Sequence, residues 1–273
     1  MDKIERITLN AFEEIVAKKR FVKPLLAKDY YITILLYLIK DVEGIYFKGG
    51  TALNKIFLNH QRLSEDIDFT LTRNEKEIRE EIHEIIKNSG LFAGISEGKN
   101  VEGFLRIIAK YKSELGEGEV FIDLNKRASI LLTPEVHKIA HFYSPFIPEF
   151  SIKTLAKEEL IAEKLKATIT RNKPRDHYDV YMIIKNNLPL NIELAKKKCK
   201  EAGKEFSIIR MFNKAKTLKN RWDKDMLTLI SEEITFQEVI KFLAQHFKLK
   251  EEKDKLKNTN KTKKLEINAR KEI

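Results

Sequence analysis

A Gly-Gly turn followed by an acid-x-acid strand, within residues 46–69, constrains the fold of this chain more than any other feature. The turn Lys48-Gly49-Gly50-Thr51 follows a short apolar segment. Glycines let backbone N–H groups approach an anion that a side chain would keep away. A helix is predicted to begin at Thr51, and its N-terminal donors and dipole favour a phosphate. The turn is therefore predicted to bind phosphate through its backbone.

The acid-x-acid strand follows a short loop and reads Asp66-Ile67-Asp68-Phe69. In a strand, both carboxylates point to one face while the apolar side chains point to the other. Two like charges on one face repel each other, and carboxylate oxygens are the ligands that Mg²⁺ prefers. Gly-Gly turns and paired aspartates are each more often structural when they occur alone. Their order and spacing predict a compact unit that holds a triphosphate between glycines and metal.

A third carboxylate is available from Asp123, in the apolar segment Val120–Leu124. Ile122 and Leu124 are expected to face the opposite side of a strand, so that Asp123 projects from one surface of the sheet. The alternative is an ordinary half-exposed strand residue. The presence of the Asp66 and Asp68 pair favours a functional role for Asp123, at a second metal or as the group that draws a hydroxyl proton.

Composition indicates a soluble protein. With 273 residues, 42% of them apolar, the chain is long enough for one large domain or two small ones. The single cysteine, Cys199, provides neither a disulfide framework nor a zinc cluster, which fits a reducing cytoplasm. The first ten residues lack the apolar region of a signal peptide, and the apolar stretch Ile32–Ile39 is too short to span a bilayer. We expect a cytoplasmic location and no membrane partner.

The net charge of +11 is distributed unevenly. Residues 1–150 contain 22 Lys/Arg and 23 Asp/Glu, a net charge of −1, whereas residues 151–273 contain 30 and 18, a net charge of +12. A near-neutral half with the acid-x-acid strand, beside a strongly basic half, is typical of a catalytic module next to a polyanion-binding module. A Lys-rich helical surface that serves solubility is the equally open alternative.

Hydrophobic periodicity and turn residues predict an α+β fold in which a first half of strands and helices precedes an α-helical C-terminal domain. Strands are expected at residues 45–48, 66–69, 103–111, 119–125 and 150–152. Helices are expected at residues 3–18, 29–40, 74–87, 156–171 and 235–247, and from Pro174 onward. The predicted units are a core domain at 1–154, a basic helical domain at 155–248 and a Lys-rich tail at 249–273.

Two acids in the helical half, Asp176 and Asp179, share a helix face with apolar residues. Such acids are costly unless they are paired, so partners are expected among Lys164, Arg171 and Arg175. A structural ion cluster that locks two helices together explains this pattern as well as a role in substrate handling does.

Four segments together resemble the AbiEii/AbiGii-toxin (MenT-like) nucleotidyltransferases, a family of the DNA polymerase β-like superfamily. The segments are Lys48-Gly49-Gly50-Thr51-Ala52-Leu53, Arg62-Leu63-Ser64-Glu65-Asp66-Ile67-Asp68-Phe69, Glu163-Lys164-Leu165-Lys166-Ala167 and Arg175-Asp176-x-x-Asp179. They occur in the family's order, and the resemblance covers residues 45–185 but not the tail.

The resemblance implies a polymerase β-like nucleotidyltransferase core with a mixed sheet, followed by a helical domain. It places Asp66 and Asp68 on Mg²⁺, with Mn²⁺ as the alternative ion. Lys164 and Asp176 match positions that support nucleotide binding and catalysis, while Asp123 is matched only by its strand context. The residues implied to contact the nucleotide are Lys48, Gly49, Gly50, Thr51 and Ser64.

The expected activity is transfer of a nucleotide from an NTP to an acceptor hydroxyl, with release of pyrophosphate. The resemblance implies the toxin of a toxin–antitoxin pair, an antitoxin as partner, and an RNA acceptor, the 3′ end of tRNA. Two alternative acceptors are a protein hydroxyl and a small molecule. A third alternative, from a different class, is a catalytically silent nucleic-acid-binding module, against which the intact Asp66 and Asp68 pair argues.

Overall fold

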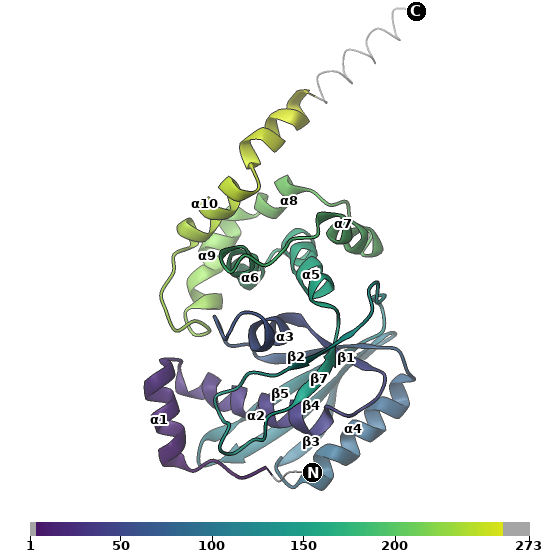
Figure 1. The fold of residues 1–273 in the computed structure, drawn as a ribbon, viewed down its shortest axis with the longest axis vertical. Helices are drawn as coiled ribbons and strands as arrows, with labels where there is room; N and C mark the ends of the chain where they lie inside the picture. Colours follow the sequence, from purple (N-terminus) through teal and green to yellow (C-terminus); the bar gives the residue numbers. More distant parts are fainter. Residues whose placement is uncertain (1–3, 259–273) are drawn as a thin grey trace, which may run out of the picture.

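The computed structural model describes residues 4–258. Its strands are β1 (Ile45–Lys48), β2 (Asp66–Leu71), β3 (Gly94–Val101), β4 (Phe104–Ser113), β5 (Gly116–Asn125), β6 (Glu135–Lys138) and β7 (Ser151–Thr154). Its helices are α1 (Leu9–Lys19), α2 (Lys23–Ile39), α3 (Gly49–Ile56), α4 (Glu75–Ser89), α5 (Lys157–Thr170), α6 (Pro174–Lys185), α7 (Ile192–Glu201), α8 (Ile208–Phe212), α9 (Ala215–Met226) and α10 (Phe236–His246). Figure 1 shows α5 to α10 gathered on one side of the sheet.

The strands form one seven-stranded mixed sheet in the order β3-β4-β5-β2-β1-β7-β6. β2 is antiparallel to β1 and parallel to β5, and β1 is parallel to β7. The strand that carries the acid-x-acid motif is therefore central, between the strand that leads into the Gly-Gly turn and the strand that carries Asp123. The mixed sheet with flanking helices and following C-terminal helices confirms the predicted fold class.

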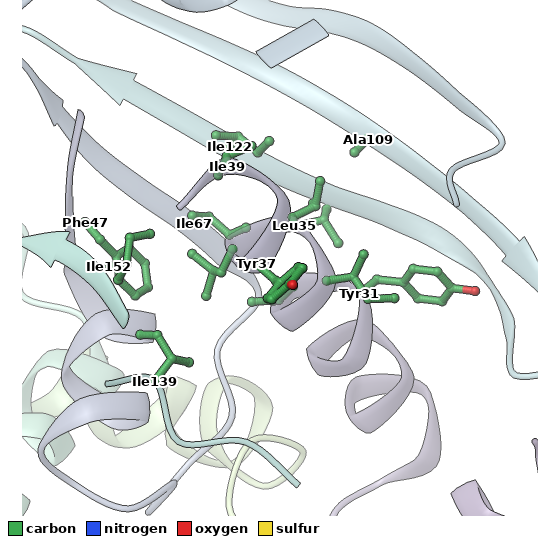
Figure 2. Close-up of a cluster of buried hydrophobic side chains, with 14 of the residues drawn as sticks. Tyr31, Leu35, Tyr37, Ile39, Phe47, Ile67, Ala109, Ile122, Ile139 and Ile152 are labelled. Carbon is green, nitrogen blue, oxygen red and sulfur yellow. The ribbon is translucent and has the colours of Figure 1, made fainter. Parts of the chain in front are cut away.

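The main hydrophobic core lies between the sheet and helices α2 and α4. Figure 2 shows Leu35 of α2 near Ile67 of β2 and Ile122 of β5. Ile67 and Ile122 are register partners on neighbouring parallel strands, and both are fully buried. Because side chains alternate along a strand, this burial directs Asp66, Asp68 and Asp123 to the opposite face of the sheet.

A second hydrophobic cluster holds the C-terminal helices together, from Ala162 of α5 to Leu243 of α10. A smaller cluster joins Leu53 and Leu58, in and after α3, to Ile161 of α5 and Ile183 of α6. Helix α3, which begins in the Gly-Gly turn, therefore packs against both the sheet and the C-terminal helices.

Several helix ends follow the signals seen in the sequence. The Asn74 side chain accepts a hydrogen bond from the Lys76 N–H at the start of α4, and Gly90 ends α4 in the left-handed conformation. The capping box between Thr235 and Glu238 is formed at the start of α10. These three predicted helix boundaries are confirmed.

Other boundaries were predicted wrongly. Helix α2 begins six residues before the expected position because Pro24 lies in its first turn, where proline is tolerated. Helix α1 begins later than expected, after the Thr8 cap, and α3 begins at Gly49 instead of Thr51. Strands β3 and β6 were not predicted.

The predicted tail begins with helical residues 249–258, and its remainder, 259–273, lies outside the described residues. Within residues 4–258, the helices are all too short or too polar to cross a membrane.

Candidate functional site

The Gly-Gly turn packs directly against the acid-x-acid strand. Gly49 has φ +81°, and a Cβ added to it would lie 2.1 Å from Oδ2 of Asp68. Lys48, the residue before the turn, is the register partner of Asp68 across β1 and β2. The two sequence devices therefore meet in one place, as their spacing predicted.

The position of Gly50 also leaves no space for a larger side chain. A Cβ at Gly50 would lie 2.5 Å from the Arg62 guanidinium and 3.4 Å from the Ser64 hydroxyl, so Ser64 lies beside the turn. The Thr51 hydroxyl donates a hydrogen bond to the backbone carbonyl of Asp66, which ties α3 to the start of β2. The first backbone N–H groups of α3 have no acceptor within the helix. They belong to Gly49, Gly50 and Thr51 and can serve an anion.

The carboxylates of Asp66 and Asp68 form no ion pair or side-chain hydrogen bond with any residue in 4–258. Burial raises the pKa of Asp68. The charge of Lys48 lowers this pKa, and the charges of Asp123 and Asp66 raise it further. Burial likewise raises the pKa of Asp66, with Arg175 opposing and Asp123 adding. These carboxylates therefore lie where negative charge is unfavourable, and no cation from residues 4–258 pairs with them.

Asp123 lies beside the other two carboxylates. It is the register partner of Asp68 on the adjacent parallel strand, so both side chains point to the same face. Asp123 is not unpaired, however. Arg106 of β4 donates from Nε and Nη2 to its two carboxylate oxygens at 2.7 and 2.8 Å.

The chemistry of Asp66 and Asp68 fits a divalent cation. Two unpaired carboxylates on one sheet face suit Mg²⁺, which is commonly held by one or two carboxylates together with substrate phosphates and water. Within the described part of the chain, no three His, Cys, Asp or Glu side chains form a ready metal-binding cluster. In this structure Asp123 therefore stands apart from a complete set of ligands and faces Arg106 instead.

Lys48 is the register partner of Asp68, and its side chain is buried. Burial lowers the pKa of Lys48, against the favourable charges of Glu163 and Asp68. Lys48 therefore lies between the acid-x-acid strand and α5, which carries Glu163. A buried ammonium group in this position adds positive charge next to the Gly-Gly turn.

Lys164 and Asp176 belong to a buried ion network that joins the two halves of the chain. Lys164 lies 2.8 Å from Asp179 and 3.5 Å from Asp176. Arg62, from the loop before β2, donates to both oxygens of Asp179 at 2.7 and 2.8 Å. Arg171 pairs in the same manner with Asp176. The pairing of the two acids with Lys164 and Arg171 was predicted.

The same network acts on the pKa of each acid. Burial alone would raise the pKa of Asp176, but Lys164 and Arg171 hold it below its usual value. Burial would also raise the pKa of Asp179, and Arg62 and Lys164 lower it. Both acids are thus charged and fully buried among cations. The charge of Lys164 also acts on Asp68, so the network adjoins the acid-x-acid strand.

Two residues of this region escaped prediction. Arg62 lies in one of the four family-like segments, but no local pattern indicates its partner, because Asp179 is 117 positions away in the sequence. Arg106 lies in a strand with no pattern that distinguishes it, and its pairing follows from the register between β4 and β5. Arg175, the third expected partner of the acids, forms no ion pair with a residue in 4–258.

Solved structures of other proteins share this fold. The chain is similar to MenT4, a nucleotidyltransferase toxin from Mycobacterium tuberculosis H37Rv, with 21% identity over 77% of this chain and 72% of that one and a TM-score of 0.58. It is similar to JHP933 from Helicobacter pylori, with 18% identity over 88% of this chain and 99% of that one and a TM-score of 0.56. At these identities the likeness shows a shared fold.

No curated protein matches the chain. A family model, described as the nucleotidyl transferase AbiEii toxin of type IV toxin–antitoxin systems, matches residues 36–244. The match includes the Gly-Gly turn, all three aspartates of the sheet and the ion network. The chain therefore belongs to the AbiEii family of toxins and is a nucleotidyltransferase.

Proposed function

We propose that this enzyme transfers a nucleotide from an NTP, in the presence of Mg²⁺, to a hydroxyl of an RNA acceptor, the 3′ end of tRNA. The observation that carries the proposal is the contrast among the acids of this region in their pairing with cations. Asp123, Asp176 and Asp179 each have an arginine partner, whereas Asp66 and Asp68 have no bound cation among the described residues. The unpaired acids are the two that adjoin the Gly-Gly turn.

The residues of the turn have a clear role in this reaction. The N–H groups at the start of α3 and the Lys48 ammonium would bind the phosphates of the NTP, with Ser64 beside them. Asp66 and Asp68 would hold the divalent ion, which supplies charge neutralisation and alignment of the phosphates when it is bound. Mn²⁺ is the alternative ion, because its preference for carboxylate oxygen is similar.

The ion network would support the site from the helical side. Arg62 fills the space above Gly50 and is fixed by Asp179, so the network sets the position of the turn. Lys164 adds positive charge that acts on Asp68, and Asp176 fixes Lys164 and Arg171. We therefore assign Lys164 and Asp176 to orientation of the nucleotide site. Asp123 would either complete the set of metal ligands or draw the proton from the acceptor hydroxyl.

An RNA acceptor is supported by the charge distribution. Residues 151–273 carry a net charge of +12, and such an excess favours a polyanion over a cationic small molecule. The family resemblance of the motifs implies the tRNA 3′ end in particular. As a toxin of its family, the enzyme would be opposed in the cell by a cognate antitoxin.

The test is incubation with each NTP, labelled at its α-phosphate, together with Mg²⁺ and total RNA. Label should enter RNA of tRNA size, and it should be lost in Asp66→Ala and Asp68→Ala. The matched control is Asp41→Ala, because Asp41 is an exposed acid in the turn between α2 and β1 and pairs with its neighbour Lys40. Label in a protein band that survives RNase would show a protein acceptor. Equal transfer to RNA by Asp66→Ala and the parent enzyme would refute the proposed site.

A further inference from the structure

Of the three aspartates on this sheet face, Asp123 is the one that is paired with an arginine, Arg106. Arg106 and Asp123 are register partners on the antiparallel strands β4 and β5, so both side chains lie on the face that carries Asp68. The two N–H groups of Arg106 take both oxygens of Asp123. This fork arrangement is the strongest geometry for a pair of these groups.

The two-pronged pairing with Arg106 disfavours a divalent ion on Asp123. The guanidinium occupies one lone pair on each carboxylate oxygen, so a metal ion could reach only the remaining lone pairs. It would also place a positive charge directly against a positive ion. The hydrogen bonds and charge of Asp123 raise the pKa of Arg106, and the charges of Asp66 and Asp68 raise it further. Arg106 thus neutralises in part the site in which a metal ion would lie.

The surroundings of Arg106 leave it able to move. Its side chain is 30% exposed, whereas that of Arg62 in the ion network is 1% exposed. Its guanidinium lies over the half-buried Phe121 ring, 4.5 Å from the centroid, on the same sheet face as Asp66. Arg106 can therefore move away from Asp123 without disturbing the core. Arg62 is buried and cannot move away from Asp179 in the same way.

We propose that Arg106 blocks Asp123 in the nucleotide-free enzyme and passes to the phosphates of the NTP when metal and nucleotide bind together. Phosphate oxygens accept the same two-pronged donation as a carboxylate does. Asp123 then becomes available beside Asp66 and Asp68. Arg106 is in this account a positioning residue that makes metal binding depend on nucleotide. The inference rests on the proposed function, because it assumes that Asp66 and Asp68 bind the ion.

The test measures Mn²⁺ binding to the full chain without nucleotide, by electron paramagnetic resonance of the free ion. Arg106→Gln removes the competitor and the positive charge, so Mn²⁺ should bind roughly tenfold more tightly or better. The matched control is Lys110→Gln. Lys110 lies on the same strand and pairs across to Glu119 of β5. Its replacement should leave Mn²⁺ binding within about twofold of the parent.

Two further variants separate this role from a structural one. Asp123→Asn in the Arg106→Gln background should abolish the gain, since the gain comes from Asp123. Arg106→Lys keeps the charge but loses the fork, so its affinity for Mn²⁺ should lie between those of the parent and Arg106→Gln. With a non-hydrolysable NTP present, Arg106→Gln should instead lower nucleotide affinity. A protein that is merely destabilised would bind the ion more weakly, which is the opposite sign.

The Mn²⁺ measurements distinguish a failure of the Arg106 role from a failure of the proposed function. Asp66→Ala is compared with the parent in the presence of the non-hydrolysable NTP. If it loses Mn²⁺ there, while Arg106→Gln and Arg106→Lys both bind Mn²⁺ as the parent does without nucleotide, the role of Arg106 is refuted and the proposed function stands. If Asp66→Ala binds Mn²⁺ as tightly as the parent in the presence of the NTP, the proposed function fails and the role of Arg106 fails with it.

Discussion

Gly49 lies against the carboxylate of Asp68 so closely that a Cβ on Gly49 would be 2.1 Å from Oδ2. No real Cβ tolerates such a distance, and the positive φ of Gly49 independently favours glycine. The turn and the acid-x-acid strand are consequently one structural unit. A change in the turn must move a carboxylate of the proposed metal site.

Gly49→Ala should therefore reduce nucleotidyl transfer on the order of a hundredfold, because a displacement of about 1 Å at a reacting centre has an effect of that size. It should also lower the free energy of unfolding by about 1–3 kcal/mol through backbone strain. Gly90→Ala is the control, since Gly90 has φ +63° with open space around it. Gly90→Ala should lose comparable stability but no activity. Equal activity losses in the two variants would contradict this explanation.

Asp179→Ala should destabilise the protein by about 3–5 kcal/mol, because it leaves Arg62 and Lys164 buried without their partner. The comparison is Asp225→Ala, which removes a more exposed pair with Arg221 and should lower stability by at most about 1 kcal/mol. Urea denaturation of both variants measures the difference. Similar midpoints for the two would show that the network contributes little to joining the halves.

Asp68→Asn should stabilise the protein at neutral pH while it removes metal binding. Burial raises the pKa of Asp68, so the folded state holds the proton more tightly than the unfolded state does. Stability is then lost as pH rises from the usual Asp value through the raised pKa. Asparagine removes that loss, and the expected gain at pH 7 is about 0.5–2 kcal/mol.

Thermal unfolding of the parent and of Asp68→Asn between pH 4 and pH 8 measures this effect. The two curves should converge toward acid pH and separate toward neutral pH. A destabilised Asp68→Asn with an unchanged pH dependence would mean that the attraction to Lys48 outweighs burial.

RNA binding should weaken steeply with salt if the basic half contacts RNA phosphates. The logarithm of the affinity should fall linearly with the logarithm of salt concentration, by about 0.7 for each phosphate contact to a single strand. Fluorescence anisotropy with labelled tRNA between low and moderate salt measures the slope. A flat response would assign the charge of residues 151–273 to solubility instead.

The elements that could be predicted from the sequence are those with local signals. The start of α4 at Asn74, its end at Gly90 and the capping box of α10 each depend on a few adjacent residues. Strand β3 has no such signal, because its sequence Gly94–Val101 is polar and mostly half-buried or exposed. It is a strand because it pairs with β4, which a local pattern does not reveal. Strand β6 similarly depends on β7.

The candidate site divides in the same way. Asp66, Asp68 and the Gly-Gly turn are separated only by helix α3 and a short loop, so their meeting could be predicted from spacing. The partner of Asp179 could not, because Arg62 comes from a loop 117 positions earlier and meets it only when the two halves pack. The engagement of Asp123 by Arg106 depends on the register between β4 and β5. The roles of these residues in catalysis, and the division at residue 155, stay predictions.

Calorimetry of NTP binding with and without Mg²⁺, on the parent, Asp66→Ala and Asp41→Ala, tests the central claim most directly. The claim is that Asp66 and Asp68 would hold a divalent ion, whose charge would favour binding of the NTP phosphates at the Gly-Gly turn. The parent and Asp41→Ala should bind at least one NTP with Mg²⁺ and bind it far more weakly without the ion, and Asp66→Ala should lose this dependence. Equal Mg²⁺-dependent binding by Asp66→Ala and the parent would contradict the account.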